Sequence, residues 1–361
     1  MPATQTSKVP SVNEEKLNAF LGKVIEDFGA ALSSGLVYIG QKLGLYKAMA
    51  GAGPLTPDEL AKRTGTVERY VREWLLNQAA GGYVVYDART GRYELPPEQA
   101  VALSDESSPF YVGGGFYVIK AMLGAQQRIM EAFRNGGGML WGEHDPDLFL
   151  GTEMFFRPGY ATHLVAEWIP ALTGIDAKLK AGATVADIGC GHGASTIIMA
   201  KAYPKSQFYG FDNHEPSIQR ARQTAAKAGV GDRVHFEVAE AGNFPDHRYD
   251  LITFFDCLHD MGDPVGAARR AHAALAAEGS VLIVEPMAGN SAEENFNPIG
   301  RTFSAASTLC CTANSLALKG PALGAVATEE ALRQTVTAGG FTKFRRATQT
   351  PFNRIFEARR S

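Results

Sequence analysis

The spacing of hydrophobic residues divides the chain into two regions. From Leu17 to Leu32, apolar side chains recur every three or four residues, which predicts a long helix with one apolar stripe. A second stripe of the same kind follows over residues 36–46. Both stripes fit either the core of a first domain or a seam between two copies of the chain, and the pattern leaves these interpretations open.

Residues 55–95 predict a winged helix. One helix ends at Gly65 and a second at Gly81, and a turn at residues 87–91 joins two short strands. Many DNA-binding proteins use this arrangement. Residues 1–110, however, hold 11 Lys and Arg against 13 Asp and Glu, a net charge of −2. Because a phosphate backbone attracts a positive excess, we expect a dimerisation and lid module without a nucleic-acid partner.

The second region changes its period. From residue 184 to 284, short apolar or β-branched runs alternate with helical segments, which predicts an α/β fold with a doubly wound, mostly parallel sheet. Two further runs, at 341–347 and 352–358, surround turn residues. The sheet should therefore end with an antiparallel strand.

These patterns predict three parts. We expect a disordered leader over residues 1–11, a mainly helical winged-helix domain over 12–150 and a sheet domain over 151–361. The sheet domain carries an Asn-, Ser- and Gly-rich insertion, residues 287–325, which we place over a substrate pocket.

Composition excludes several classes of protein. The 361 residues carry a net charge of −3, so charge gives no reason to expect nucleic-acid binding. Four cysteines are too few for a disulfide scaffold, and their spacing fits no zinc site. The first 16 residues are polar and include acids, and no apolar run approaches the roughly 18 residues of a membrane span. We expect a cytoplasmic protein without a membrane partner.

The strongest motif lies between a predicted strand and a helix. It runs Asp187-Ile188-Gly189-Cys190-Gly191-His192-Gly193, and such glycines permit a tight turn and a close approach of the backbone to a ligand. Gly189 and Gly191 also fit the dinucleotide fingerprint. Asp187 would repel a pyrophosphate, however, and suits a ligand with a cationic amine, such as S-adenosylmethionine (SAM).

Three later strands end in residues that fit the same ligand. Asp212 is placed to accept hydrogen bonds from ribose hydroxyls, and Glu240 and Ala241 to meet the adenine edge. The expected cofactor-binding residues are Asp187, Gly189, Gly191, His192, Gly193, Thr196, Asp212, Asn213, Glu240, Ala241, Asp256 and Cys257.

The glycine motif, together with Asp212 and the terminal hairpin, resembles the class I SAM-dependent methyltransferases over about residues 165–361. Residues 12–110 resemble the winged-helix dimerisation domain of plant and bacterial small-molecule O-methyltransferases. The resemblance implies a SAM-dependent enzyme with a small-molecule acceptor, and a homodimer formed through the N-terminal domain.

A second motif concerns catalysis. Leu258-His259-Asp260-Met261-Gly262-Asp263 resembles the Leu-His-Asp-x-x-Asp stretch of plant phenolic O-methyltransferases, where the His is the general base and a Glu lies beside it. The resemblance implies that His259 is the base and Glu285 its partner. An imidazole suits the role because it titrates near neutral pH. A His that only packs or caps is the alternative.

The acceptor pocket is expected over His259. Its candidate residues are Tyr117, Phe155, Tyr160, Asn297 and Arg301. An inward-pointing Arg301 would favour a carboxylate or phosphate on the acceptor. We expect no metal, because Asp212-Asn213 falls at the ribose position rather than around an acceptor.

Three functions fit these residues. The first is methyl transfer to a hydroxyl of a small molecule, with His259 as base. The second is methylation of a thiol or thioether; a thioether has no proton to lose and needs no base. The third is a SAM-sensing transcription regulator, against which the acidic balance of residues 1–110 argues.

Overall fold

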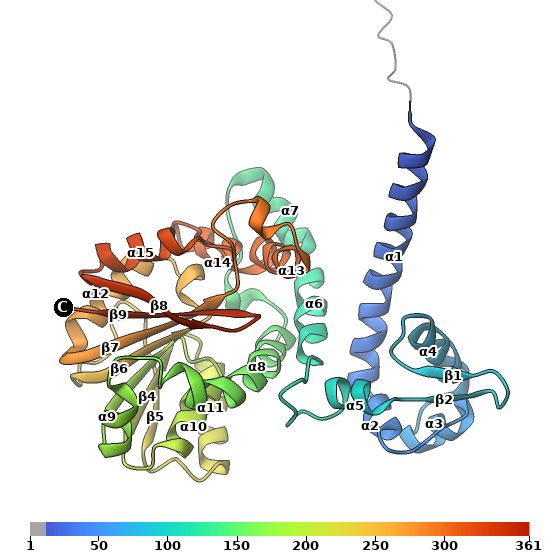
Figure 1. Ribbon diagram of the computed structural model, residues 1–361, viewed down its shortest axis with the longest axis horizontal. Coiled ribbons are helices and arrows are strands. Elements are labelled where there is room, and N and C mark those ends of the chain that lie inside the picture. Colours follow the sequence, from blue (N-terminus) through green and yellow to red (C-terminus); the bar gives the residue numbers. More distant parts are fainter. Residues whose placement is uncertain (1–11, 361) are drawn as a thin grey trace, which may run out of the picture. The chain divides into compact units, whose positions relative to one another are not determined.

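The computed structural model describes residues 12–360, so the predicted leader lies outside the described residues. The chain forms two compact units, Met1–Asp105 and Glu106–Ser361 (Figure 1). None of the helices in the described part combines the length and the apolar character that crossing a membrane requires.

The first unit contains the predicted helix-turn-helix and hairpin. Its elements are α1 (Glu14–Lys42), α2 (Leu45–Met49), α3 (Pro57–Thr64), α4 (Glu68–Ala80), β1 (Val85–Asp87), β2 (Arg92–Glu94) and α5 (Pro97–Leu103). Helix α3 begins at a capping box, in which Thr56 and Glu59 each bind the other's backbone N–H. Strands β1 and β2 pair antiparallel and form the wing.

Helix α1 has two different halves. Near its C-terminal end, Gly40 lies so close to Trp74 that an added Cβ would stand 2.6 Å from the indole, and Val37 is fully buried. Towards its N-terminus, by contrast, Phe20, Phe28 and Leu32 are 61%, 60% and 75% exposed. The stripe from Leu17 to Leu32 is therefore not part of this chain's core.

The second unit is built on the predicted doubly wound sheet. Its strands are β3 (Thr184–Ile188), β4 (Gln207–Asp212), β5 (Val234–Val238), β6 (Tyr249–Phe255), β7 (Leu275–Pro286), β8 (Lys343–Gln349) and β9 (Asn353–Arg359). They lie in the order β5-β4-β3-β6-β7-β9-β8 (Figure 1). Strands β3 to β7 are parallel, while β9 and β8 are antiparallel, which confirms the predicted terminal hairpin.

Alternating side chains place a core on each face of this sheet. Val185 belongs to one core and the adjacent Ala186 to the other, as the two-residue period of a strand requires. The first core packs against α9 (Ile175–Ala181), α10 (Ala194–Ala202) and α11 (Glu215–Lys227); the second packs against α12 (Pro264–Ala274) and α15 (Glu329–Ala338).

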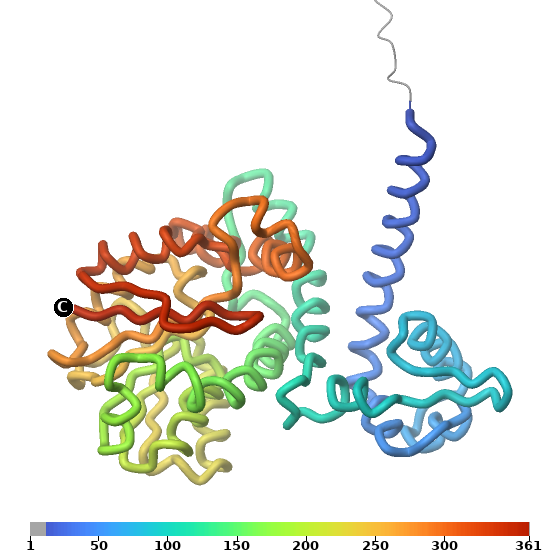
Figure 2. Tube along the Cα trace, viewed as in Figure 1, coloured from blue at the N-terminus to red at the C-terminus, as the bar shows by residue number. Residues whose placement is uncertain are grey.

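Segments outside the sheet's regular alternation also belong to this unit. Before the sheet come α6 (Gly114–Gly124), α7 (Gln126–Asn135), the 3-10 turn η1 (Trp141–Glu143), α8 (Asp147–Gly159) and the π-helical η2 (Tyr160–Trp168). The insertion is largely helical, with η4 (Glu293–Asn295), α13 (Pro298–Ala306), the π-helical η5 (Ser307–Cys311) and α14 (Thr312–Ala317). Figure 2 traces both segments along the chain.

The division into units differs from the predicted domain boundary after residue 150, since residues 106–150 lie in the second unit. The physical reason is the contact of α6 with α8. An added Cβ on Gly151 would stand 2.7 Å from Tyr117 Cβ and 2.8 Å from the carbonyl oxygen of Gly114. Backbones this close hold α6 on α8, and thereby in the unit that contains the sheet.

This crossing gives a test by substitution. We expect Gly151→Ala to lower the free energy of unfolding by about 1–3 kcal/mol, because the methyl group has no room between two backbones. The measurement is urea unfolding followed by circular dichroism.

Gly124→Ala is the matched control, because an added Cβ there meets nothing within 4 Å. Its effect should stay within about 1 kcal/mol and can be stabilising. Equal losses in the two variants would contradict the packing account.

Candidate functional site

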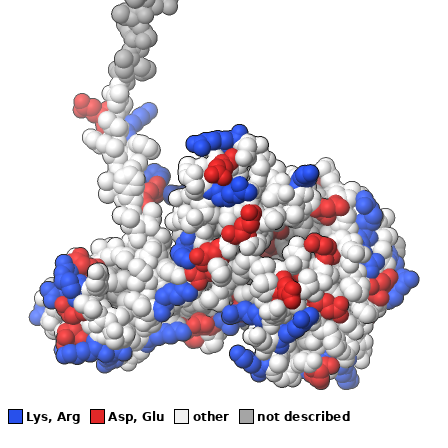
Figure 3. All heavy atoms as spheres, turned by 180° about the vertical axis from the view of Figure 1, so that it is seen from behind, with Lys and Arg blue, Asp and Glu red and all other residues white. Residues whose placement is uncertain are grey.

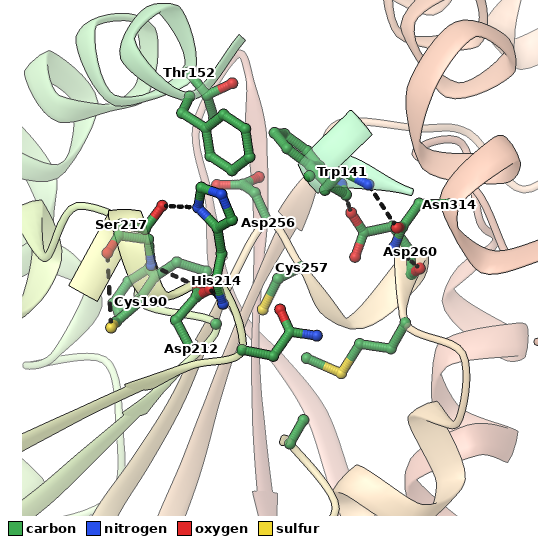
Figure 4. A pocket seen from close by; sticks show the side chains of 18 of the residues that line it. Trp141, Thr152, Cys190, Asp212, His214, Ser217, Asp256, Cys257, Asp260 and Asn314 are labelled. Carbon is green, nitrogen blue, oxygen red and sulfur yellow. Dashed lines mark hydrogen bonds between the residues drawn. The ribbon is translucent and has the colours of Figure 1, made fainter. Parts of the chain in front are cut away.

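A cavity of about 820 Å³ opens at the carboxyl ends of the parallel strands, entirely within the second unit (Figure 4). The turn after β3 and the residues that follow β4, β5 and β6 form its floor. Residues of η1 and α8, including Trp141 and Thr152, form another part of its wall. This edge of an open α/β sheet is where ligands bind.

The glycine turn has the left-handed geometry that glycine favours. Gly189, Gly191 and Gly193 have φ values of +70°, +50° and +78°. Gly189 and Gly191 line the cavity, and a Cβ on Gly191 would meet nothing within 4 Å. Gly193 does not line it; a Cβ there would stand 2.5 Å from Phe236. Gly191 therefore leaves room for a ligand, Gly189 permits the close approach of Cys257, and Gly193 permits packing beneath the turn.

Asp187 does not face the cavity, contrary to expectation. Its carboxyl group is 1% exposed and accepts hydrogen bonds from Ser195 at 2.7 Å, Thr196 at 2.6 Å and Thr253 at 2.9 Å. Burial raises the pKa of this carboxyl. Asp187 is buried away from the cavity and fixes the start of α10. Thr196, which donates to Asp187, is also buried and does not line the cavity.

Asp212 lines the cavity at the end of β4. Its Oδ2 accepts the backbone N–H of Gly191 and its Oδ1 that of His214, both at 2.9 Å. Burial raises the pKa of this carboxyl as well. Asp212 therefore holds the glycine turn while remaining on the cavity wall.

The expected residues next to Asp212 also line the cavity. These are Asn213, Glu240 and Ala241, with the Asn213 amide 3.4 Å from the Glu240 carboxylate. His192 lies on the same wall, where its Nδ1 is 2.9 Å from Glu153 of α8.

Several residues of the wall were not expected from the sequence. The ring of Phe149 stacks on that of His214, with 4.2 Å between the ring centroids. Trp141 donates its indole N–H to Asp260 at 2.6 Å. Both come from the aromatic-rich segment before the sheet. Aromatic content was the available signal, but only tertiary packing shows which rings reach the cavity.

Asp256 follows β6 and has the left-handed φ of +51°, which is uncommon for a residue with a side chain. Its Oδ2 accepts from the Tyr160 hydroxyl at 2.9 Å and its Oδ1 from the Asn353 amide at 2.8 Å. Burial, followed by the nearby Glu285, raises the pKa of Asp256 to about 8. Asp256 and the neighbouring Cys257 both line the cavity (Figure 4).

His259 and Glu285 lie together but behind the cavity wall. His259 Nδ1 is 2.5 Å from Glu285 Oε2, and the two residues are 2% and 1% exposed. Burial alone lowers the pKa of His259, but the Glu285 carboxylate and the nearby Cys311 reverse this and raise it well above its ordinary value. Cys257 and Asp260 line the cavity, whereas His259 between them does not.

Cys311 closes this buried cluster. The ligand-bearing atoms of His259, Asp260 and Cys311 lie within 4.8 Å of one another. Cys311 is the last residue of the π-helical η5, so an irregular helix brings the thiol here.

The expected acceptor residues are not brought together. Tyr160 lines the cavity, while Tyr117, Phe155, Asn297 and Arg301 do not. Asn297 caps α13 by accepting the N–H of Gly300 at 2.9 Å and lines a separate cavity of about 450 Å³. Arg301 is exposed on α13 and does not line the cavity, so the structure does not meet the condition of an inward-pointing guanidinium there. Residue type and neighbourhood in the sequence do not determine the direction of a side chain.

The charge of the cavity is one-sided. Among the described residues that line it are seven acids and no Lys or Arg; the acids are Glu143, Glu153, Asp212, Glu240, Asp256, Asp260 and Asp263. On the outer face drawn in Figure 3, by contrast, both signs are interspersed. An acidic wall of this kind favours a cationic ligand.

Comparisons with known proteins agree with the two units. Residues 179–340 match the family model described as "Methyltransferase domain", and residues 30–105 match "Rv2258c-like winged HTH domain". The chain therefore combines a methyltransferase domain with an N-terminal winged helix-turn-helix domain.

One curated relative is the 27-O-demethylrifamycin SV methyltransferase of Amycolatopsis mediterranei, 36% identical over 131 residues. That match covers 34% of this chain and 48% of the relative, so the chain spans about half the length of this relative.

Solved structures resemble the chain over nearly its whole length. Human N-acetylserotonin methyltransferase in complex with SAM has a TM-score of 0.69 at 16% identity, covering 98% of this chain and 99% of that one. An O-methyltransferase family protein from Burkholderia thailandensis has a TM-score of 0.69 at 17% identity, covering 97% and 99%. At these identities the likeness establishes the fold.

The buried His259–Glu285 pair predicts how stability depends on pH. A raised His pKa in the folded state stabilises the fold fully below the unfolded value of about 6.5, and this stabilisation is lost as the pH rises through the folded value. Breaking a buried pair costs about 3–5 kcal/mol. We expect Glu285→Gln to lower the free energy of unfolding by about 3–5 kcal/mol at pH 6 and by less at pH 9, as measured by urea unfolding.

Glu167→Gln is the control, since it breaks a more exposed pair, in which the His163 side chain is 30% exposed and that of Glu167 52%. It should leave the pH dependence unchanged. A Glu285→Gln loss that is as large at pH 9 as at pH 6 would show that the pair is not charged in the fold.

Proposed function

We propose that this protein transfers a methyl group from SAM to a hydroxyl of a small molecule. The observation that carries the proposal is the acidic cavity beside the glycine turn, within the domain that matches the methyltransferase model. SAM supplies a methyl group on a positively charged sulfur, and the cavity wall carries acids without Lys or Arg among its described residues.

The order of the strands suggests how SAM would lie. Neighbouring strands run β5-β4-β3-β6, and their carboxyl ends bear Glu240 near β5, Asp212 on β4 and the glycine turn after β3. An extended ligand with adenine by Glu240 and ribose on Asp212 would place its sulfonium over the turn, towards β6. Asp212 has hydrogen-bond capacity left for this, since each oxygen of a carboxylate has more than one acceptor site.

A hydroxyl acceptor would enter on the β6 side, where Phe156, Tyr160 and Phe255 line the cavity. Positioning its oxygen in line with the methyl group and the sulfur would supply much of the catalysis. The acidic wall would disfavour an acceptor that carries a carboxylate, which reverses our expectation from Arg301.

Donor binding gives the first test. By isothermal titration calorimetry, the wild-type protein should bind both SAM and S-adenosylhomocysteine. Asp212→Ala removes the proposed ribose acceptor and a support of the turn, so it should weaken both ligands by about 10- to 100-fold, in line with about 1.5–3 kcal/mol per charged hydrogen bond. Asp232→Asn, whose side chain is 74% exposed, is the control and should bind normally.

The acceptor is identified by incubation with methyl-labelled SAM and fractionated metabolite extract, followed by mass spectrometry of the labelled product. Label should pass to a small molecule with the wild-type protein and not with Asp212→Ala. Absence of binding to both SAM and S-adenosylhomocysteine would sink the proposed function.

We propose further that two copies of the chain pair through α1. The apolar side chains along its N-terminal half are exposed to water, which is unfavourable. A two-fold pair would bury the same stripe on both copies.

Replacing Phe20 and Phe28 with Asp should therefore convert a dimer to the 38.7 kDa monomer, as measured by sedimentation velocity. Phe133→Asp, which changes a 75% exposed ring in the second unit, should leave the mass unchanged. A wild-type monomer at micromolar concentration would contradict the pairing.

A further inference from the structure

We propose that Asp256 senses the positive charge of the bound methyl donor and takes the proton that a hydroxyl acceptor loses. The proposal rests on the proposed binding of SAM and adds a catalytic residue to it. It stands on the position of Asp256 on the cavity wall, its strained backbone and the two side chains that hold its carboxyl group.

Three elements converge on this carboxyl group. Asp256 ends β6, Tyr160 begins the π-helical η2 and Asn353 begins β9. The Tyr160 hydroxyl and the Asn353 amide donate to different oxygens of Asp256, at 2.9 and 2.8 Å. A non-glycine residue at a φ of +51° is held in an uncommon conformation, which the surrounding contacts must maintain. The carboxyl group is thus fixed in direction, as a proton acceptor requires.

His259 does not have this access. It is 2% exposed, and it is absent from the cavity wall that Asp256 lines. A base must come within hydrogen-bond distance of the proton that it removes. In this arrangement Asp256 meets the acceptor, and His259 stands behind it.

The charges around Asp256 support a change of protonation during the reaction. The titratable neighbours of Asp256 are Glu285, His259, Tyr160 and Cys257. Burial, followed by the charge of Glu285, raises the pKa of Asp256 to about 8. A sulfonium placed over the turn would favour the ionised carboxylate and lower this pKa. When the methyl group leaves, the sulfur becomes neutral and the pKa of Asp256 rises again.

The step balances without a further reactant. The acceptor oxygen attacks the methyl carbon and a C–O bond forms, while the S–C bond breaks and its electron pair stays on sulfur. The O–H electron pair stays on the acceptor oxygen, and the proton moves to Asp256. The products are a methyl ether, S-adenosylhomocysteine and a protonated Asp256, which returns its proton to solvent.

Proton release on donor binding tests the proposal without an identified acceptor. At a pKa of about 8, roughly nine-tenths of the Asp256 groups are protonated at pH 7. Binding of SAM at pH 7 should therefore release close to one proton, and binding of neutral S-adenosylhomocysteine far less. The number is obtained by calorimetry in buffers that differ in ionisation enthalpy.

Asp256→Asn removes the titrating group and keeps its shape, and Asn tolerates a positive φ. This variant should bind S-adenosylhomocysteine normally, bind SAM without proton release, and lose about 100-fold or more in turnover once an acceptor is known. Asp232→Asn makes the same chemical change outside the cavity, at a side chain that is 74% exposed, and should leave the proton release unchanged.

The outcomes separate this proposal from the proposed function. If neither ligand binds the wild-type protein, the proposed function fails. If both bind but release equal numbers of protons, or if Asp256→Asn releases as many as the wild type, the role of Asp256 is overturned.

Discussion

The site depends on two carboxylates that fix the turn after β3 and the helix that follows it. Asp187 accepts hydrogen bonds from three hydroxyl groups, two of them at the start of α10. Asp212 accepts one from the backbone N–H of Gly191, within the turn. An unpaired buried carboxylate is costly, so these hydrogen bonds are strongly maintained. The left-handed glycines permit the turn, but the two acids determine its position over the sheet.

The same requirement explains the electrostatics of the cavity. Acids used as structural acceptors at strand ends gather at one edge of the sheet, because the strands are parallel. Burial raises the pKa of Asp260 to about 6, and the Trp141 indole donates a hydrogen bond to the Asp260 carboxyl group. With no Lys or Arg among the described residues of the wall, a cationic ligand is the natural partner of this edge. Structural hydrogen bonding and ligand selectivity thus share one set of residues.

Sequence patterns predicted the fold and the cofactor side of the cavity better than its acceptor side. Alternation of short strands and helices predicted the mostly parallel sheet, and the last two runs predicted its terminal hairpin, because strand and helix periods are local properties. Asp212, Glu240 and Asp256 line the cavity as expected, since each follows a strand whose direction was known. Arg301 and Asn297 belong to the insertion, where residue type alone did not identify the side chains that reach the cavity. Tyr160 was named, but its hydrogen bond to Asp256 depends on tertiary packing.

The two π-helical segments show why the acceptor side escapes such reasoning. A π-helix places residues out of the 3.6-residue period on which amphipathic patterns rest. Tyr160 begins one such segment and contacts Asp256; Cys311 ends the other and lies against His259. Each irregular helix therefore delivers a side chain to one of the two acid-containing clusters that follow β6. Asp256 reaches the cavity and His259 does not, and this division results from what packs on each: a Tyr hydroxyl at the wall, and a thiol and a carboxylate behind it.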